Sequence, residues 1–329
     1  MANLKTLILT RKDIKRLITI GEAIDCVEDA FREFGLGRAH MPAKIYLDLP
    51  QFHGDFRAMP AYIEKMNACS LKWVNAHPQN ARYGIPSVMA VLILNDPRTG
   101  VPLAIMDATY LTSLRTGAAG GVAAKYLARK KVDVVAMVGC GVQARTQLQA
   151  LRLVRRIKTV YVWGHRPELT RLFIKGMQAN GEKMIFADTI KDCVCEADII
   201  VTSTPSRAPI VKLPWIKQGA HINAIGADAP GKQELDAAIL KKAKVVIDDW
   251  HQAIHSGEVN VPLRKKQISV DHIYGDLGSI VAGKKKGRTS ENEITVFDST
   301  GLAIQDTAVA HYVFQRATEL KIGSYASFI

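Results

Sequence analysis

The sequence lacks an apolar run long enough to cross a membrane, and it lacks a secretory signal. No apolar run reaches the roughly 18 residues that a membrane-spanning helix needs. The N-terminus, MANLKTLILTRKD, has neither the apolar core nor the small-residue cleavage site of a signal peptide. We therefore expect a cytoplasmic protein that does not act on membranes.

Cysteine is scarce, and its spacing fits no metal site. The five thiols are Cys26, Cys69, Cys140, Cys193 and Cys195. Their number is odd, and the last two are separated by one residue rather than by the two that zinc and redox motifs use. The sequence therefore indicates free thiols and no metal site.

Acidic residues are too few to balance the basic ones. The chain has 44 Lys and Arg against 31 Asp and Glu, a formal charge of +13. Apart from Arg152-Arg155-Arg156 and residues 284–288, the basic residues are spread along the chain rather than gathered in a stripe, so nucleic acid is not the indicated partner. The charge instead favours attraction for anionic small molecules.

With 329 residues, 48% hydrophobic, and no repeat or low-complexity linker, the chain suits two globular domains. The first part opens with a strand at 4–9. Capping-box pairs then start two helices, Thr10 with Asp13 and Thr19 with Glu22. From 44 to 108 short apolar strands alternate with turn residues, which predicts an antiparallel sheet or open barrel.

Beyond a helix over about 109–129, strands and helices alternate, as in a doubly wound parallel sheet with helices on both faces. The first strand of this region runs into Gly139-Cys140-Gly141-Val142-Gln143-Ala144 and then into a helix. In this G-x-G-x-x-A spacing Gly139 makes a tight turn, Gly141 lets a pyrophosphate approach the backbone, and Ala144 keeps helix and strand close. A purely structural turn is the alternative reading.

The predicted fold class is therefore α/β, a Rossmann doubly wound parallel sheet plus a discontinuous α+β domain. We place a substrate-binding and dimerisation domain at 1–121, with 304–329 packing back on it, and a dinucleotide-binding domain at 122–303.

In a dinucleotide-binding fold that prefers NAD, an acidic residue about 20 positions past the glycines binds the ribose 2′-hydroxyl. This chain has no carboxylate at that position. The second strand of the dinucleotide domain ends in Gly164-His165-Arg166. Arg166, helped by His165, could hold a 2′-phosphate, so NADP(H) is favoured and NAD(H) is possible. Alternatively, Arg166 caps the helix that begins at Pro167 or stacks on adenine.

Four further side chains are candidates for chemistry. Asp228 follows a predicted strand at the sheet edge where ligands bind, so it is a candidate acid or base, with an Asx turn as the alternative. Lys72 lies among apolar neighbours, where an ammonium is costly without an anion. With Arg57 and Arg115 it suggests a carboxylate-binding pocket, although each of the three alone is more often a surface or salt-bridge residue.

With these residues in view, the chain resembles the ornithine cyclodeaminase/mu-crystallin family over essentially its full length, and most closely an archaeal-type alanine dehydrogenase branch. The matching stretches are GDFRAMPA, LKWVNAHPQN, MDATYLTSLRTGAAGGVAAKYLAR, VGCGVQA, TSTPS, HINAIGADAPGKQEL and FDSTGLAIQD.

The resemblance implies a homodimer that acts on a small amino, oxo or imino acid. It also implies that Lys72 and Arg115 face the substrate or nicotinamide and that Asp228 is the catalytic acid/base. The residues implied to line the cofactor are Val142, Gln143, Thr204, Ile225, Gly226, Lys232 and Ser299.

Two positions depart from the relatives. Similar cyclodeaminases carry a Glu where this chain has Arg57, which would repel the distal ammonium of ornithine and offer a fork to a carboxylate. Gly164 stands where an NAD-specific relative would have Asp.

We therefore predict an NAD(P)-dependent enzyme that interconverts a small L-amino acid with its 2-oxo acid, alanine with pyruvate first. The alternatives are a 1-pyrroline-2-carboxylate reductase, an ornithine cyclodeaminase and a non-catalytic NADPH-binding protein.

Overall fold

The computed structural model describes residues 4–178 and 181–328, and the chain divides into two compact units. Unit 1 comprises Met1–Arg115 with Leu302–Ile329, and unit 2 comprises Thr116–Gly301. The first boundary falls inside the continuous helix α3 (Ala108–Leu127), not at the predicted 121/122. Ala and Gly gather in the part of this helix that follows the boundary, at 117–124, whereas 109–116 contain neither. Residues 1–3 and 329, which the prediction assigned to the first domain, lie outside the described residues.

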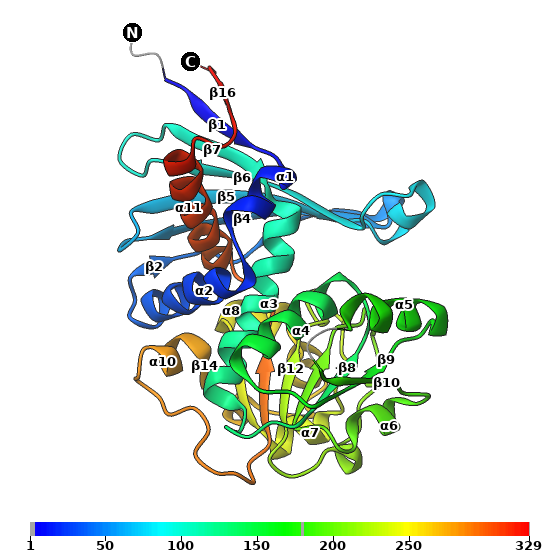
Figure 1. Ribbon diagram of the computed structural model, residues 1–329. Coiled ribbons are helices and arrows are strands. Elements are labelled where there is room, and N and C mark those ends of the chain that lie inside the picture. The colour runs from blue at the N-terminus through cyan, green and yellow to red at the C-terminus, as the bar shows by residue number, and fades with distance from the viewer. Residues whose placement is uncertain (1–3, 179–180, 329) are drawn as a thin grey trace. The chain divides into compact units, whose positions relative to one another are not determined.

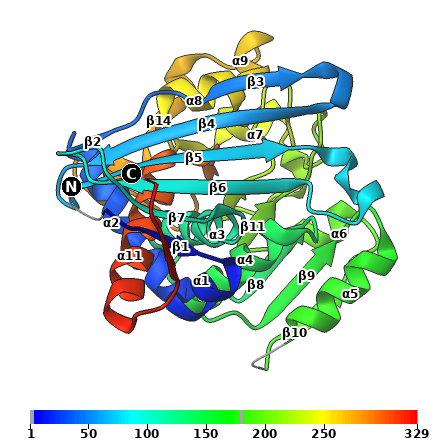
Figure 2. The ribbon, with the colours of Figure 1, turned by 90° about the horizontal axis from the view of Figure 1, so that it is seen from above.

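Unit 1 is built on a mainly antiparallel sheet with strand order β16-β1-β7-β6-β5-β4-β2, and β3 pairs with β4. Its strands are β1 (Thr6–Leu9), β2 (Ala39–His40), β3 (Ile45–Leu49), β4 (Gly54–Ile63), β5 (Ala68–Ala76), β6 (Val88–Asn95), β7 (Pro102–Asp107) and β16 (Ser324–Ala326). Figure 2 shows β3 to β6 side by side. The predicted antiparallel strands are confirmed, and β1 adds a parallel pairing with β7.

The helices of unit 1 are α1 (Arg11–Leu17), α2 (Ile20–Gly35) and α11 (Ala303–Leu320), with the short 3₁₀ turns η1 (Pro50–Phe52) and η2 (Pro78–Tyr83). Two of them, α1 and α2, begin at the predicted caps, Thr10 and Thr19. Both capping boxes form, at Thr10 with Asp13 and at Thr19 with Glu22. Helices α2 and α11 pack against each other (Figure 1).

Alternation along β4 and β5 decides which side chains α11 covers. On β5, Lys72 and Val74 are buried on the face against which α11 packs, while Leu71 and Trp73 point to the exposed face. Arg57 on β4 pairs in register with Val74 and lies on the buried face as well. Two cations are thus placed on the buried face of the sheet, where each needs an anionic partner.

Unit 2 is a parallel sheet with strand order β10-β9-β8-β11-β12-β15-β13-β14. Its strands are β8 (Val134–Val138), β9 (Thr159–Trp163), β10 (Lys183–Phe186), β11 (Ile199–Thr202), β12 (His221–Ala224), β13 (Lys244–Ile247), β14 (Ile273–Asp276) and β15 (Thr295–Asp298). Its helices are α4 (Val142–Val154), α5 (Pro167–Met177), α6 (Ile190–Val194), α7 (Ala237–Lys242), α8 (Trp250–Ser256), α9 (Asn260–Arg264) and α10 (Leu277–Val281), with 3₁₀ turns η3 (Leu213–Trp215) and η4 (Val270–His272).

Helices cover both faces of this sheet, as Figure 1 shows. Successive residues of one strand enter opposite cores: Val135 and Met137 of β8 pack with α4 and α5, whereas Ala136 and Val138 pack with α6 and α7. The predicted doubly wound Rossmann sheet is therefore confirmed. The strand order reverses between β8 and β11, and open sheets of this kind bind ligands at such a switch point.

Candidate active site

The glycine turn lies where the strand order reverses. Gly139 has φ 114°, and a Cβ there would lie 2.7 Å from the Ser203 Oγ, so only glycine fits. Helix α4 follows with Gly141 as its N-cap, and no side chain caps it. The N–H groups of its first turn are thus available to phosphate oxygens. Val142, Gln143 and Ala144 form this turn.

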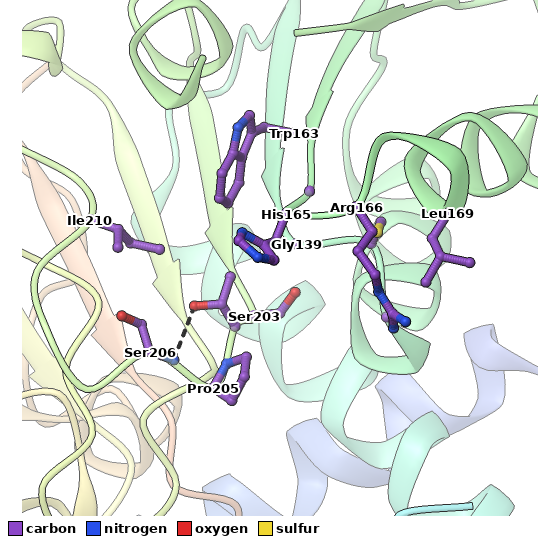
Figure 3. Close-up of a pocket in the computed structure, with 13 residues that line it drawn as sticks. Gly139, Trp163, His165, Arg166, Leu169, Ser203, Pro205, Ser206 and Ile210 are labelled. Carbon is purple, nitrogen blue, oxygen red and sulfur yellow. Dashed lines mark hydrogen bonds between the residues drawn. The ribbon is translucent and has the colours of Figure 1, made fainter. Parts of the chain in front are cut away.

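A pocket of about 550 Å³ lies at the carboxyl ends of β8, β9 and β11 (Figure 3). It is lined by Gly139, Cys140, Gly141, Trp163, Gly164, His165, Arg166, Leu169, Ser203, Thr204, Pro205, Ser206 and Ile210. The structure therefore brings together six of the residues predicted to bind the cofactor, at positions 139, 141, 164, 165, 166 and 204.

Sequence reasoning missed the apolar part of this lining. Trp163, Leu169 and Ile210 offer rings and aliphatic groups on which an adenine can pack. Trp163 gave one signal, because it is the last residue of β9, at the sheet edge where ligands bind. Leu169 on α5 and Ile210 in the loop after β11 gave none.

The residue after β9 is glycine for a steric reason. A Cβ at Gly164 would lie 2.5 Å from the Thr170 Oγ1 and 2.7 Å from the Cys140 Sγ, so a carboxylate side chain does not fit there. In Figure 3 the His165 ring points toward the pocket between Trp163 and Ser203, whereas the Arg166 side chain lies on the side of Leu169. Within residues 4–178 and 181–328, no hydrogen bond or ion pair engages the exposed Arg166 guanidinium.

Asp228 follows β12 and forms an ion pair. Its Oδ1 accepts from the Lys232 Nζ at 2.5 Å, and the Asp228 side chain is 38% exposed. Ile225 and Gly226 precede it directly after the strand. Ser299 follows β15, where its N–H donates to the carbonyl oxygen of Ala224 at 3.0 Å. These predicted residues thus gather at one edge of the sheet, outside the lining of the pocket.

The second group of candidates is a buried ionic cluster in unit 1. The Lys72 Nζ donates to the Asp306 Oδ2 at 2.5 Å, and the Arg115 Nε donates to the Asp306 Oδ1 at 3.0 Å. Arg115 also donates to the Gln305 Oε1 at 2.9 Å. The side chains of Lys72 and Asp306 are each 1% exposed. Two cations therefore share one carboxylate in a dry environment, and an anion is the ligand that such a cluster can accept.

Burial lowers the pKa of the Lys72 ammonium to about 7, because desolvation outweighs the opposing charge of Asp306. The positive charges of Arg115 and Lys44 lower the pKa further. A lysine with a pKa near neutrality can both hold an anion and exchange a proton. Sequence reasoning missed Asp306, which lies 234 positions from Lys72, and also Lys44.

Arg57 is engaged by a carboxylate that was not predicted. Its Nε and NH2 groups donate to the two carboxylate oxygens of Asp55 at 2.8 and 3.1 Å, and its guanidinium lies over the Tyr46 ring. Part of the Arg57 charge is therefore neutralised before any ligand binds.

A doubly wound parallel sheet with an uncapped glycine turn and a pocket at its switch point defines a dinucleotide-binding protein of the Rossmann class. The model of the ornithine cyclodeaminase/mu-crystallin family matches residues 4–321, and the chain belongs to this family.

Among its relatives, an alanine dehydrogenase of Archaeoglobus fulgidus is 51% identical, over 99% of both chains. The solved structure of an archaeal alanine dehydrogenase dimer with bound NAD has a TM-score of 0.95 and 51% identity, covering 99% of this chain and 100% of that one. A Thermococcus litoralis Δ¹-pyrroline-2-carboxylate reductase, solved with NADH and L-proline, has a TM-score of 0.93 and 38% identity, covering 97% and 99%.

Two kinds of feature are absent from the described residues, a membrane-spanning helix and a metal-binding cluster. None of the helices there is both long enough and apolar enough to cross a membrane. No group of three or more His, Cys, Asp and Glu side chains in that part of the chain is placed to hold a metal ion.

Proposed function

We propose that this protein is an NAD(P)-dependent oxidoreductase that interconverts L-alanine with pyruvate and ammonia. The observation that carries the proposal is the buried cluster of Lys72, Arg115 and Asp306, an anion-binding arrangement in a chain whose other unit has a dinucleotide pocket. The 51% identity to an alanine dehydrogenase supports the same substrate class.

Each candidate residue then has a role that its chemistry allows. Arg115 and Lys72 hold the substrate carboxylate, and Asp306 fixes both cations in place. Asp228 transfers the proton to or from the substrate nitrogen or the attacking water, and the ion pair with Lys232 holds its carboxylate in place. Arg57 contributes a smaller share to substrate binding because Asp55 already pairs with it.

The residues of unit 2 fit a dinucleotide. The uncapped start of α4 and the turn at Gly139 and Gly141 would hold the pyrophosphate, and the pocket wall at Trp163 and Ile210 would pack on the adenine. The further residues proposed to contact the dinucleotide are Val142, Gln143, Thr204, Ile225, Gly226, Lys232 and Ser299. The bound nicotinamide supplies the hydride for reduction or takes it in oxidation.

We further propose that NADP(H) binds more tightly than NAD(H). The steric restriction at Gly164 keeps a ribose-binding carboxylate away from that position, and the Arg166 side chain is available to a 2′-phosphate. The solved relatives named above contain bound NAD or NADH, so this preference would set the chain apart from them.

Reduction of 1-pyrroline-2-carboxylate to proline is the second candidate. It is favoured by the 38% identity to a reductase solved with NADH and L-proline. The cyclic imine presents the same carboxylate to the cations of unit 1, and its reduction needs no ammonia.

We propose a homodimer formed through the exposed face of the unit 1 sheet. Ile45, Trp73 and Val91 lie in one row across β3, β5 and β6, and they are 63%, 43% and 49% exposed. Such a row is apolar enough to favour burial against a second copy. Sedimentation at micromolar concentration should show a dimer, and a monomer there would contradict the proposal.

A panel of reduced cofactors and acceptors tests the function. Oxidation of NADPH and NADH would be followed with pyruvate plus ammonium, pyruvate alone, 1-pyrroline-2-carboxylate and glyoxylate, beside an ornithine-to-proline assay. We expect turnover with pyruvate only when ammonium is present. Turnover with the cyclic imine alone would favour the second candidate, and ornithine conversion would contradict both.

A further inference from the structure

The loops that follow β11 and β12 are joined by a buried carboxylate that no step of the proposed reaction uses. Glu234 is fully buried. Its Oε1 accepts from the N–H and the Oγ1 of Thr204, both at 2.7 Å, and its Oε2 accepts from the N–H of Gly226 at 2.9 Å. One side chain therefore bridges two loops that carry proposed cofactor contacts.

The two loops approach each other so closely that residue 226 must be glycine. A Cβ on Gly226 would lie 2.2 Å from the carbonyl oxygen of Thr204 and 2.5 Å from the Oε2 of Glu234. The bridge therefore sets a short and specific separation between the ends of the two strands.

The backbone beside Glu234 supports the same wall of the pocket. The N–H of Gln233 donates to the carbonyl oxygen of Ser206 at 3.1 Å, and the N–H of Ile210 donates to that of Glu234 at 2.7 Å. Thr204, Ser206 and Ile210 all line the pocket. Side chain and backbone thus hold one wall together.

Two more carboxylates hold Glu234 in turn. The Glu258 Oε1 accepts from the N–H groups of Glu234 and Leu235 at 2.9 and 2.6 Å. The two carboxylate oxygens of Asp298 accept from the N–H groups of Glu258 and Val259 at 2.8 and 3.1 Å. We name Asp298, Glu258 and Glu234 the carboxylate ladder. It runs from the end of β15 to the two loops.

Burying the three carboxyl groups of the ladder costs folding free energy. Their retention argues that the geometry they impose on the loops has a function. Burial raises the pKa of all three carboxyl groups, that of Asp298 to about 8, and the neighbouring Glu234 and Asp298 add to the rise at Glu258. Backbone N–H groups are the partners that define its geometry, and it belongs to no candidate metal cluster in the described part of the chain.

We propose that Glu234 is a positioning residue for the dinucleotide, because it fixes the separation of the Thr204 and Gly226 loops. The proposal rests on the cofactor part of the proposed function and is independent of which acid is reduced. Neither Glu234 nor the rest of the ladder needs to touch the dinucleotide.

The test compares cofactor affinity with fold stability in Glu234→Gln. The variant keeps one acceptor oxygen, so the N–H of either Thr204 or Gly226 faces an amide N–H instead. NADH binding would be titrated by nucleotide fluorescence well below the unfolding temperature. We expect the Kd for NADH to rise about tenfold to a hundredfold, since a buried backbone N–H loses its acceptor and the two loops are no longer bridged. Because this readout needs no turnover, failure of the alanine dehydrogenase assay would not affect it.

Asp198→Asn is the matched control. Asp198 is also buried in unit 2 and accepts from two backbone N–H groups, those of Asp133 and Val134 at 2.8 and 2.9 Å, but it lies at the amino ends of the strands. We expect this variant to lower the melting temperature and to leave the Kd for NADH within about twofold. If Glu234→Gln also loses only stability and keeps the parent Kd, Glu234 is structural and the proposal is wrong.

Glu234→Asp tests whether the length of the side chain matters when its carboxylate is kept. It retains the carboxylate but shortens it by one methylene, so it cannot bridge both loops, and its Kd for NADH should also rise. A parent-like Kd would overturn a positioning role. If Glu234→Gln does not fold, Glu258→Gln tests the next step of the ladder, where we expect a smaller rise; an unchanged Kd would again overturn the proposal.

Discussion

Each unit buries a group of charges, and the two groups are stabilised in different ways. In unit 1, Lys72 and Arg115 share the carboxylate of Asp306, so two cations meet one side-chain anion. In unit 2 the carboxylate ladder is held by backbone N–H groups. While Lys72 is protonated the first group has a cation in excess, and we propose that it binds the substrate carboxylate. The second carries no side-chain cation to bind an anion, and it serves to hold loops in place.

The largest expected effect concerns proton transfer in unit 2. Asp228→Asn preserves shape but cannot exchange the proton, so turnover should fall roughly 10²–10⁴-fold, while the Kd for NADPH changes only a few-fold. Steady-state kinetics and a binding titration would check this, with the exposed Asp271→Asn as the control. Parent turnover in Asp228→Asn would show that this residue only forms a turn.

The next effect is expected from the shared carboxylate of unit 1. Asp306→Asn removes the buried carboxylate that Lys72 and Arg115 share, so the free energy of unfolding should fall by roughly 3–5 kcal/mol. Denaturant unfolding would measure it, with the exposed Asp25→Asn of α2 as the control. A loss no greater than that of the control would mean that the cluster is not needed for stability.

The same substitution should move the pH dependence. In the parent, protonated Lys72 holds the substrate carboxylate, so kcat/KM for pyruvate should fall as pH rises through about 7. Asp306 opposes the lowering of the Lys72 pKa, so its removal lowers this pKa further and the fall should begin at lower pH. An unchanged profile in Asp306→Asn would show that Lys72 does not govern the decline.

A smaller effect is expected at the adenosine end of the pocket. Arg166→Ala should remove most of the preference for NADPH over NADH, about 1.5–3 kcal/mol if a charged hydrogen bond is lost. Paired titrations of both cofactors would measure it. The control is Arg171→Ala. It removes a cation from α5, the helix that follows Arg166, and this cation lies over the Phe186 ring. Equal dissociation constants in the parent would exclude the preference altogether.

The smallest effect is expected at Arg57. Because Asp55 already pairs with this guanidinium, Arg57→Gln should lower kcat/KM for pyruvate by less than about tenfold, the equivalent of a hydrogen bond. A loss beyond a hundredfold would show that Arg57 contacts the substrate carboxylate directly despite its pairing with Asp55. Ornithine should remain a poor substrate of the parent.

The sequence predicted what depends on local pattern. The alternation of strands and helices in unit 2 and the turn at Gly139 are each encoded within short stretches, because apolar periodicity and glycine spacing act between near neighbours. The pairing of Lys72 with Asp306 is different, since it depends on how α11 packs on β5. The same holds for the ladder, whose members come from the end of β15 and from two separate loops. The fold class was therefore predictable, whereas the partners of the buried charges were not.

Transfer of a labelled hydride tests the central claim most directly. The protein would be incubated with pyruvate, ammonium and NADPH that carries deuterium at both positions of nicotinamide C4, and the alanine formed would be analysed by mass spectrometry. The account predicts L-alanine with one deuterium on its α-carbon. Unlabelled alanine, or none at all while 1-pyrroline-2-carboxylate yields labelled proline, would contradict it.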